Sequence, residues 1–133
     1  MSSGISRAYR VKLLDHLLKN DALSQPSALW VGLYTAAPSA TGGGTETTYT
    51  NYARVQCDDW TGATAADPSV CYNASAVTFA SAAASATIAA FGVFSASSAG
   101  DMIAYGAASG TLSVGTTPQF AASALQVTMN ETA

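Results

Sequence analysis

The sequence has few charged residues for its length. Only 10% of its 133 residues are charged, whereas 49% are hydrophobic, and soluble domains usually contain roughly 25% charged residues. So few charges cannot cover the surface of a free monomer, which favours a surface that is buried against partner subunits. A surface solvated by the abundant Ser, Thr and Asn residues is the alternative.

Basic residues are nearly absent after the first nineteen positions. Four of the five lie there, namely Arg7, Arg10, Lys12 and Lys19. With Asp15 they give residues 1–20 a net charge of +3, while Arg54 and seven acidic residues give the remainder −6. A basic N-terminal segment joined to an acidic remainder can steer assembly. Four basic residues are too few to indicate a nucleic-acid partner, and we expect none.

Long apolar runs and clusters of catalytic residues are also missing. No run of 18 apolar residues occurs, so the sequence predicts no membrane span, and the first residues do not form a secretory signal. The one histidine, His16, follows Asp15 on a predicted helix, where adjacent side chains do not face each other. Zinc-site spacings and the order of acidic residues in an EF-hand are both absent. We therefore expect no cofactor, no metal site and no enzymatic activity.

Two cysteines, Cys57 and Cys71, form a candidate disulfide. A bridge between them would close a loop of about 15 residues and contribute roughly 3 kcal/mol in the chain-entropy model. Two buried thiols are the alternative. A protein that assembles in the cytoplasm would keep its thiols reduced at first, and the disulfide could form later outside the cell. The sequence leaves both alternatives open.

The spacing of apolar residues predicts one N-terminal amphipathic helix over residues 5–20. Its apolar stripe consists of residues four apart, widened by two more leucines: Ile5, Tyr9, Leu13, Leu17, Leu14 and Leu18. Ser3 or Ser6 is expected to cap its N-terminus. Pro26 prevents the helix from continuing much further.

The rest of the chain is predicted to be mainly β. Strand-like segments alternate with Gly, Ser and Asp, at residues 28–36, 52–58, 74–80, 87–95, 102–107, 111–114 and 125–129. This spacing predicts an antiparallel β-sandwich of jelly-roll type, in a single β-rich domain over residues 1–133. Gly32, inside the first strand, indicates a bulge or the close approach of another segment. Residues 38–50, with three consecutive glycines, are expected to be a flexible Gly/Thr-rich loop or an arm.

Seven short segments, each present once, are spaced along most of the chain. They are LLDHLL (13–18), PSALWVGLYTAAP (26–38), YARV (52–55), VTF (77–79), FGVF (91–94), MIAYG (102–106) and FAASALQVTM (120–129). As an ordered set they resemble a family of small phage and prophage virion proteins, often labelled tail-fibre-like. The resemblance implies a virion component without catalytic residues. The stretch from Cys57 to Cys71 departs from the family pattern, so the resemblance assigns it no role.

The resemblance and the composition together predict a structural protein of a bacteriophage, assembled in the host cytoplasm and located in the virion. Small size, low charge and the lack of a long repetitive shaft favour a capsid decoration (cement) protein that stabilises the head lattice through the major capsid protein. A tail-fibre, baseplate or neck appendage is the alternative, and a host-surface carbohydrate-binding module is a second. We expect a homo-oligomer, with a trimer favoured. The candidate partner contacts are Arg7, Arg10, Trp30, Tyr34, Tyr49, Tyr52, Arg54 and Trp60.

Overall fold

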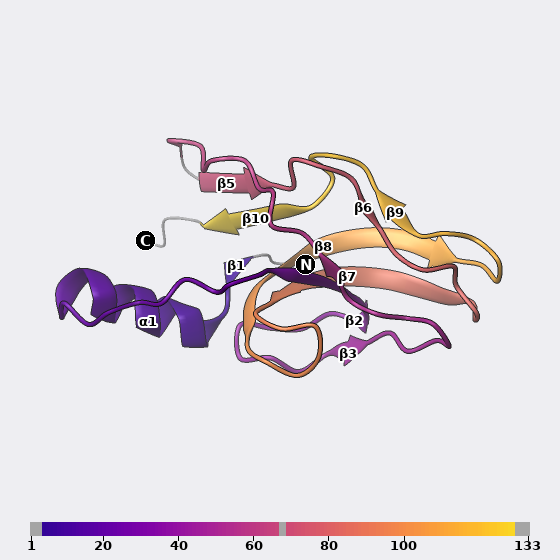
Figure 1. Cartoon of the computed structure of the whole chain (residues 1–133), viewed down its shortest axis with the longest axis horizontal. Coiled ribbons are helices and arrows are strands. Elements are labelled where there is room, and N and C mark those ends of the chain that lie inside the picture. The colour runs from indigo at the N-terminus through magenta and orange to yellow at the C-terminus, as the bar shows by residue number, and fades with distance from the viewer. Residues whose placement is uncertain (1–3, 67–68, 130–133) are drawn as a thin grey trace.

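The computed structural model describes residues 4–66 and 69–129, and its centre is one antiparallel sheet (Figure 1). Its long strands lie in the order β8-β7-β2, with bounds Met102–Leu112, Ala86–Phe94 and Trp30–Ala36. Three two-residue strands flank them: β1 (Gly4–Ile5) on β8, and β3 (Thr45–Glu46) and β4 (Val55–Gln56) on β2. The long strands form where β-branched and aromatic residues gather, since these side chains suit a pleated surface.

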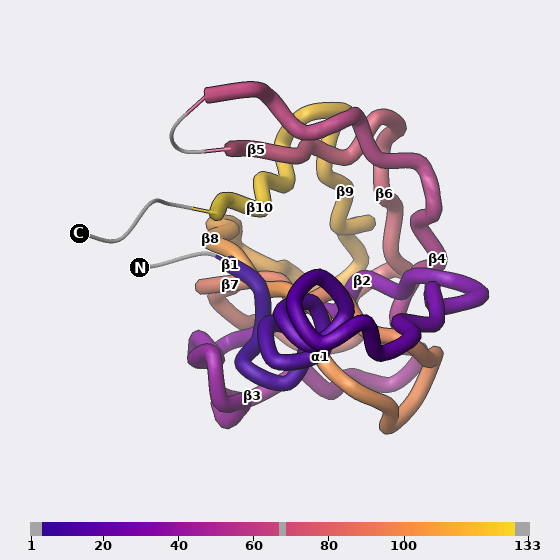
Figure 2. The backbone as a smooth tube through the Cα atoms, turned by 90° about the vertical axis from the view of Figure 1, so that its left-hand side faces the viewer, coloured from indigo at the N-terminus to yellow at the C-terminus, as the bar shows by residue number. Residues whose placement is uncertain are grey.

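Two small sheets cover one face of this central sheet. One pairs β5 (Ser69–Tyr72) with β10 (Gln126–Met129), and the other pairs β6 (Val77–Thr78) with β9 (Gln119–Phe120). Figure 2 shows these four strands on one side of the long strands β8, β7 and β2. The predicted fold class, a mainly β antiparallel sandwich with one N-terminal helix, is confirmed.

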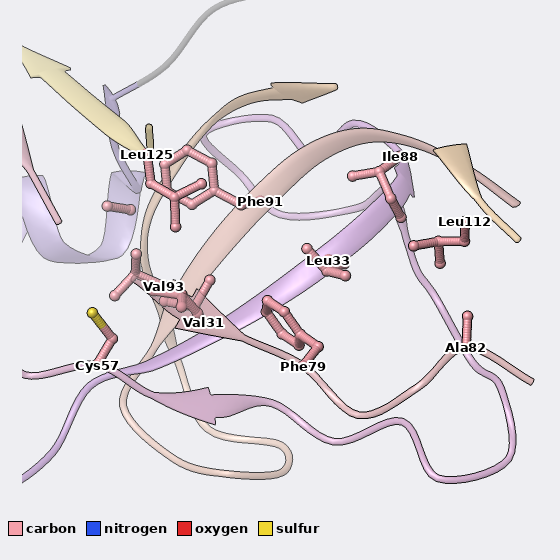
Figure 3. Close-up of a cluster of buried hydrophobic side chains, with 12 residues drawn as sticks. Val31, Leu33, Cys57, Phe79, Ala82, Ile88, Phe91, Val93, Leu112 and Leu125 are labelled. Atoms are coloured by element: carbon pink, nitrogen blue, oxygen red, sulfur yellow. The ribbon is translucent and has the colours of Figure 1, made fainter. Parts of the chain in front are cut away.

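The main hydrophobic core lies between the two layers (Figure 3). Val31 and Leu33 of β2 pair with Val93 and Phe91 of β7, and their side chains share the covered face because alternate residues of a strand point to opposite sides. The second layer covers them with buried side chains such as Leu125. A fully buried side chain of this size contributes about 1.5–3 kcal/mol relative to exposure.

The opposite face of the central sheet carries a smaller cluster of Tyr34, Ala90 and Phe94, with Trp30 and Met102 at its margin. Gly32 and Gly92 pair across β2 and β7 at its centre. A Cβ on Gly32 would lie 2.6 Å from Glu46 Oε2, and one on Gly92 would lie 2.9 Å from the Phe94 ring. The predicted close approach of another segment at Gly32 is therefore confirmed.

The N-terminal helix, α1, spans Arg7–Leu18, which is shorter than the predicted range of 5–20. Ser6 is the N-cap, since its hydroxyl accepts a hydrogen bond from Tyr9 N at 3.4 Å, while Ser3 lies outside the described residues. Gly4 and Ile5 cannot join the helix because they pair with β8 as β1. None of the helix residues is buried, so the apolar stripe does not pack into the core.

In the structure, residues 38–50 form a loop that is held by backbone hydrogen bonds. Ser39 and Gly42 exchange backbone hydrogen bonds of 2.9 Å, and Thr47 N donates to Leu33 O at 2.8 Å. The three consecutive glycines have φ values of 101°, 76° and 73°, a region that other residues rarely adopt. The three glycines therefore allow the backbone conformation that brings β3 alongside β2.

Both cysteines are free thiols in the structure. Cys57 is buried in the main core, whereas Cys71 lies on β5, opposite Val127 of β10, and is half-buried. Only Cys57 is therefore a buried thiol, and a disulfide between the two cysteines stays a prediction.

Candidate assembly surface

Helix α1 projects past the end of the central sheet (Figure 1). Four of its apolar side chains are largely exposed: Val11 at 52%, Leu14 at 56%, Leu17 at 66% and Leu18 at 81%. Residues 7, 11, 14 and 18 share one side of a helix with 3.6 residues per turn, and residues 10 and 17 lie at its margin. We call this set, Arg7, Arg10, Val11, Leu14, Leu17 and Leu18, the helix face. A contiguous apolar surface of this kind is typical of an interaction site.

Polar contacts hold α1 in place and leave the helix face uncovered. Arg7 N donates to Ala40 O at 2.7 Å, and Lys12 Nζ lies 3.5 Å from Asp101 Oδ2. At the other end, Asp21 N donates to Asp15 O at 3.1 Å as the chain turns back along the helix. These contacts involve the backbone and charged side chains, so the leucine side chains of the helix face remain exposed.

An open groove of about 780 Å³ lies between the first turns of α1 and the central sheet. Its apolar lining includes Val11, Phe94 and Met102, and the Lys12 and Asp101 side chains also border it. Val11 belongs to both the groove and the helix face. The two features therefore form one continuous surface at this end of the molecule.

A cluster around Arg54 fastens the loops beside that groove. Arg54 Nε and Nη2 donate to Glu46 Oε2 and Oε1, both at 2.9 Å, and Nη1 donates to Ala96 O at 3.1 Å and Ala99 O at 2.8 Å. Tyr52 Oη donates to Glu46 Oε2 at 2.7 Å and accepts from Leu33 N at 3.0 Å. The Arg54 side chain is only 10% exposed. The cluster ties β3 and the 95–101 loop to β2.

The charge state of this cluster is set by burial and by Arg54. Burial acts to raise the pKa of Glu46, but hydrogen bonds from Arg54 and Tyr52 and attraction to Arg54 outweigh it, and the pKa falls below its ordinary value. Burial, followed by the hydrogen bond to Glu46, raises the pKa of Tyr52. Glu46 therefore stays ionised and Tyr52 stays protonated at neutral pH.

The candidate partner contacts divide into exposed and internally used residues. Arg7 and Arg10 are exposed on the helix face, and neither forms an ion pair within the described ranges. Tyr34 is buried and stacks on Phe94 with ring centres 6.2 Å apart, and Arg54 is committed to Glu46. These last two residues stabilise the subunit itself.

Three of the remaining candidates also have internal partners. Tyr49 Oη donates to Ala80 O at 2.7 Å, Trp60 Nε1 donates to Cys57 O at 2.9 Å, and Tyr52 belongs to the Arg54 cluster. Trp30 is half-buried at the margin of the smaller cluster. Their contact with partner subunits stays a prediction.

Sequence reasoning missed the groove and the exposure of the leucines. The spacing of Leu14, Leu17 and Leu18 indicates an apolar stripe, but a stripe looks the same whether its own subunit or another covers it. Phe94 and Met102 line the groove from segments predicted only as strands. No pattern in the sequence signals that these strand ends meet the helix.

The described residues contain no group of three or more His, Cys, Asp or Glu side chains that could hold a metal ion. Within the same part of the chain, no helix is both long and apolar enough to cross a membrane.

The fold and the helix face describe a small antiparallel β domain with an uncovered apolar helix. The family model described as "Podophage GP4 fiber I protein gp80" matches residues 4–128. The chain belongs to this family and is a structural protein of a bacteriophage virion. No curated protein matches the chain.

Proposed function

We propose that the chain is a non-enzymatic component of a phage fibre that works by assembling with copies of itself and with other virion proteins. The observation that carries this proposal is the helix face, with its leucines 56–81% exposed. The description of the family, a fiber I protein of a podophage, supports the fibre location over the capsid decoration predicted from composition.

Burial of the helix face supplies the driving force for assembly. Each leucine side chain transferred from water to an interface contributes up to about 1.5–3 kcal/mol. Part of that free energy offsets the loss of rigid-body freedom when subunits associate. Several copies that bind together gain further affinity, because later contacts form within one assembly.

The location of the chain in purified particles tests this function. Gold-labelled antibodies against the folded chain are expected to mark the fibres in electron micrographs, and quantitative mass spectrometry should find copies in proportion to other fibre proteins. Label over the head, with copies in proportion to the major capsid protein, would instead support capsid decoration. Binding on a glycan array would support the carbohydrate-binding alternative.

A further inference from the structure

Ion pairs inside the subunit leave a specific set of charges unbalanced. Three of the five basic residues have an acidic partner, in the pairs Lys12–Asp101, Lys19–Asp21 and Arg54–Glu46. Arg7 and Arg10 have none within the described residues, and both lie on the helix face. The exposed surface of α1 is therefore apolar and basic at the same time.

This combination disfavours symmetric pairing of two helix faces. A two-fold contact would place each patch against its own copy, so the Arg7 and Arg10 side chains of both subunits would come together. Like charges brought together in an interface oppose binding. The helix face fits a partner surface that is acidic and partly apolar.

Another part of the same chain has that character. Asp58 and Asp59 are exposed just after β4, and neither has a basic partner among the described residues. Leu29 and Trp60 beside them are half-buried, so each presents some apolar surface. We call Leu29, Asp58, Asp59 and Trp60 the acidic acceptor.

Hydrogen bonds hold the carboxylates of the acidic acceptor in position. Asp58 Oδ1 accepts from Leu29 N at 2.7 Å and Oδ2 accepts from Gln56 Nε2 at 2.6 Å, while Asp59 Oδ2 accepts from Ser75 Oγ at 2.7 Å. The bond from Leu29, followed by that from Gln56, lowers the pKa of Asp58. These bonds involve one or both oxygens of each group and leave lone pairs for further donors.

We propose that the helix face of one copy docks on the acidic acceptor of a second copy, head to tail. Arg7 and Arg10 pair with Asp58 and Asp59, and the leucines of α1 pack against Leu29 and Trp60. The contact rests on the proposed function and deepens it by naming the partner as this same chain. Head-to-tail contacts close into a ring when the rotation between copies allows it, and the favoured trimer is one such ring.

Charge reversal in the full-length chain tests this contact, with mass measured by size-exclusion chromatography and light scattering. The Arg7→Glu, Arg10→Glu variant and the Asp58→Arg, Asp59→Arg variant are each expected to weaken self-association by at least about tenfold. The quadruple variant, which exchanges both charges, should recover most of the lost association. Lys19→Glu is the matched control on α1, because Lys19 is paired with Asp21 in its own subunit, and it should leave the mass unchanged.

Circular dichroism of each variant shows whether its fold is intact, and only folded variants are compared. The head-to-tail contact is overturned if the wild-type chain stays monomeric. It is also overturned if neither charge reversal changes the mass of the oligomer. A folded quadruple variant that fails to reassociate overturns it as well. A monomer that binds anionic vesicles, or that binds only another virion protein, would show that the helix face binds that partner. This result would also overturn the contact. Antibody labelling of virions is independent of these results, so failure here leaves the fibre location to be judged separately.

Discussion

The Arg54 guanidinium lies over the Phe94 ring, with its central carbon 3.5 Å from the centre of the ring. The same guanidinium forms two parallel hydrogen bonds with Glu46. Arg54 is the one basic residue after position 19, and the paired hydrogen bonds depend on its planar group. Its role is to join two loops to the central sheet.

Replacement of Arg54 by lysine is expected to destabilise the fold by about 3 kcal/mol, because an ammonium group cannot make the paired hydrogen bonds to Glu46. Urea unfolding followed by circular dichroism measures this change. Arg10→Lys, on the exposed helix face, is the matched control and should change the free energy of unfolding by less than about 0.5 kcal/mol. Equal stability of the Arg54→Lys variant and the wild type would show that the cluster does not hold the loops.

Stability should decrease in acid because of Glu46. The folded state lowers the pKa of Glu46 below its ordinary value of 4.5, so its contribution is fully present above that pH. The contribution is lost as pH falls through the lower, folded-state pKa. Urea unfolding at a series of pH values from about 7 to about 3 should show this loss in the wild type. In Glu46→Gln, which cannot ionise, that part of the acid dependence should disappear, and an unchanged profile would argue against this assignment.

Asn73 is expected to be critical for the second layer. It is fully buried; its Nδ2 donates to Ser75 O at 2.8 Å and Ala121 O at 3.0 Å, and its Oδ1 accepts from Leu125 N at 2.8 Å. Asn73→Ala should cost about 2–4 kcal/mol in urea unfolding, because several buried polar groups lose their partners. Gln126→Ala, at an exposed position on β10, is the control. A cost for Asn73→Ala no larger than that of the control would contradict this role.

The two thiols should differ in reactivity. Cys57 is 7% exposed, and burial raises the pKa of its thiol, so both access and the thiolate fraction are low. Cys71 is half-buried. Under native conditions a thiol reagent should therefore label Cys71 first and Cys57 slowly, as peptide mapping by mass spectrometry would show. Labelling of neither cysteine until a reductant is added would indicate that a disulfide forms in the isolated protein.

The long strands and three of the short ones, β4, β6 and β10, lie at or near predicted segments, whereas β1, β3, β5 and β9 were not predicted. β2 lies within a predicted segment and β7 begins one residue before another, because Val, Phe and Tyr residues favour strands. β8 was predicted as two pieces, residues 102–107 and 111–114, yet Gly110 between them pairs with Ile88 of β7. β5 was missed because its pairing comes from a distant strand, as in Val70 opposite Thr128.

The assembly surface was predicted only in part. Arg7 and Arg10 were identified from the uneven charge, and the leucine stripe was identified from its spacing. Their exposure depends on where α1 starts, and that depends on the hydrogen bond from Ser6 N to Ile103 O at 2.8 Å. A contact between residues so far apart in sequence leaves no local pattern.

The proposed role of the helix face in assembly is tested most directly by measuring the number of copies of the chain in purified particles. Phage that encode the Leu14→Asp, Leu17→Asp double variant are compared with phage that encode Val114→Asp, because Val114 is 68% exposed and lies outside the helix face. Quantitative mass spectrometry should find the double variant largely lost from particles and Val114→Asp retained at the wild-type level, with both purified proteins folded. Full incorporation of the folded double variant would contradict the account.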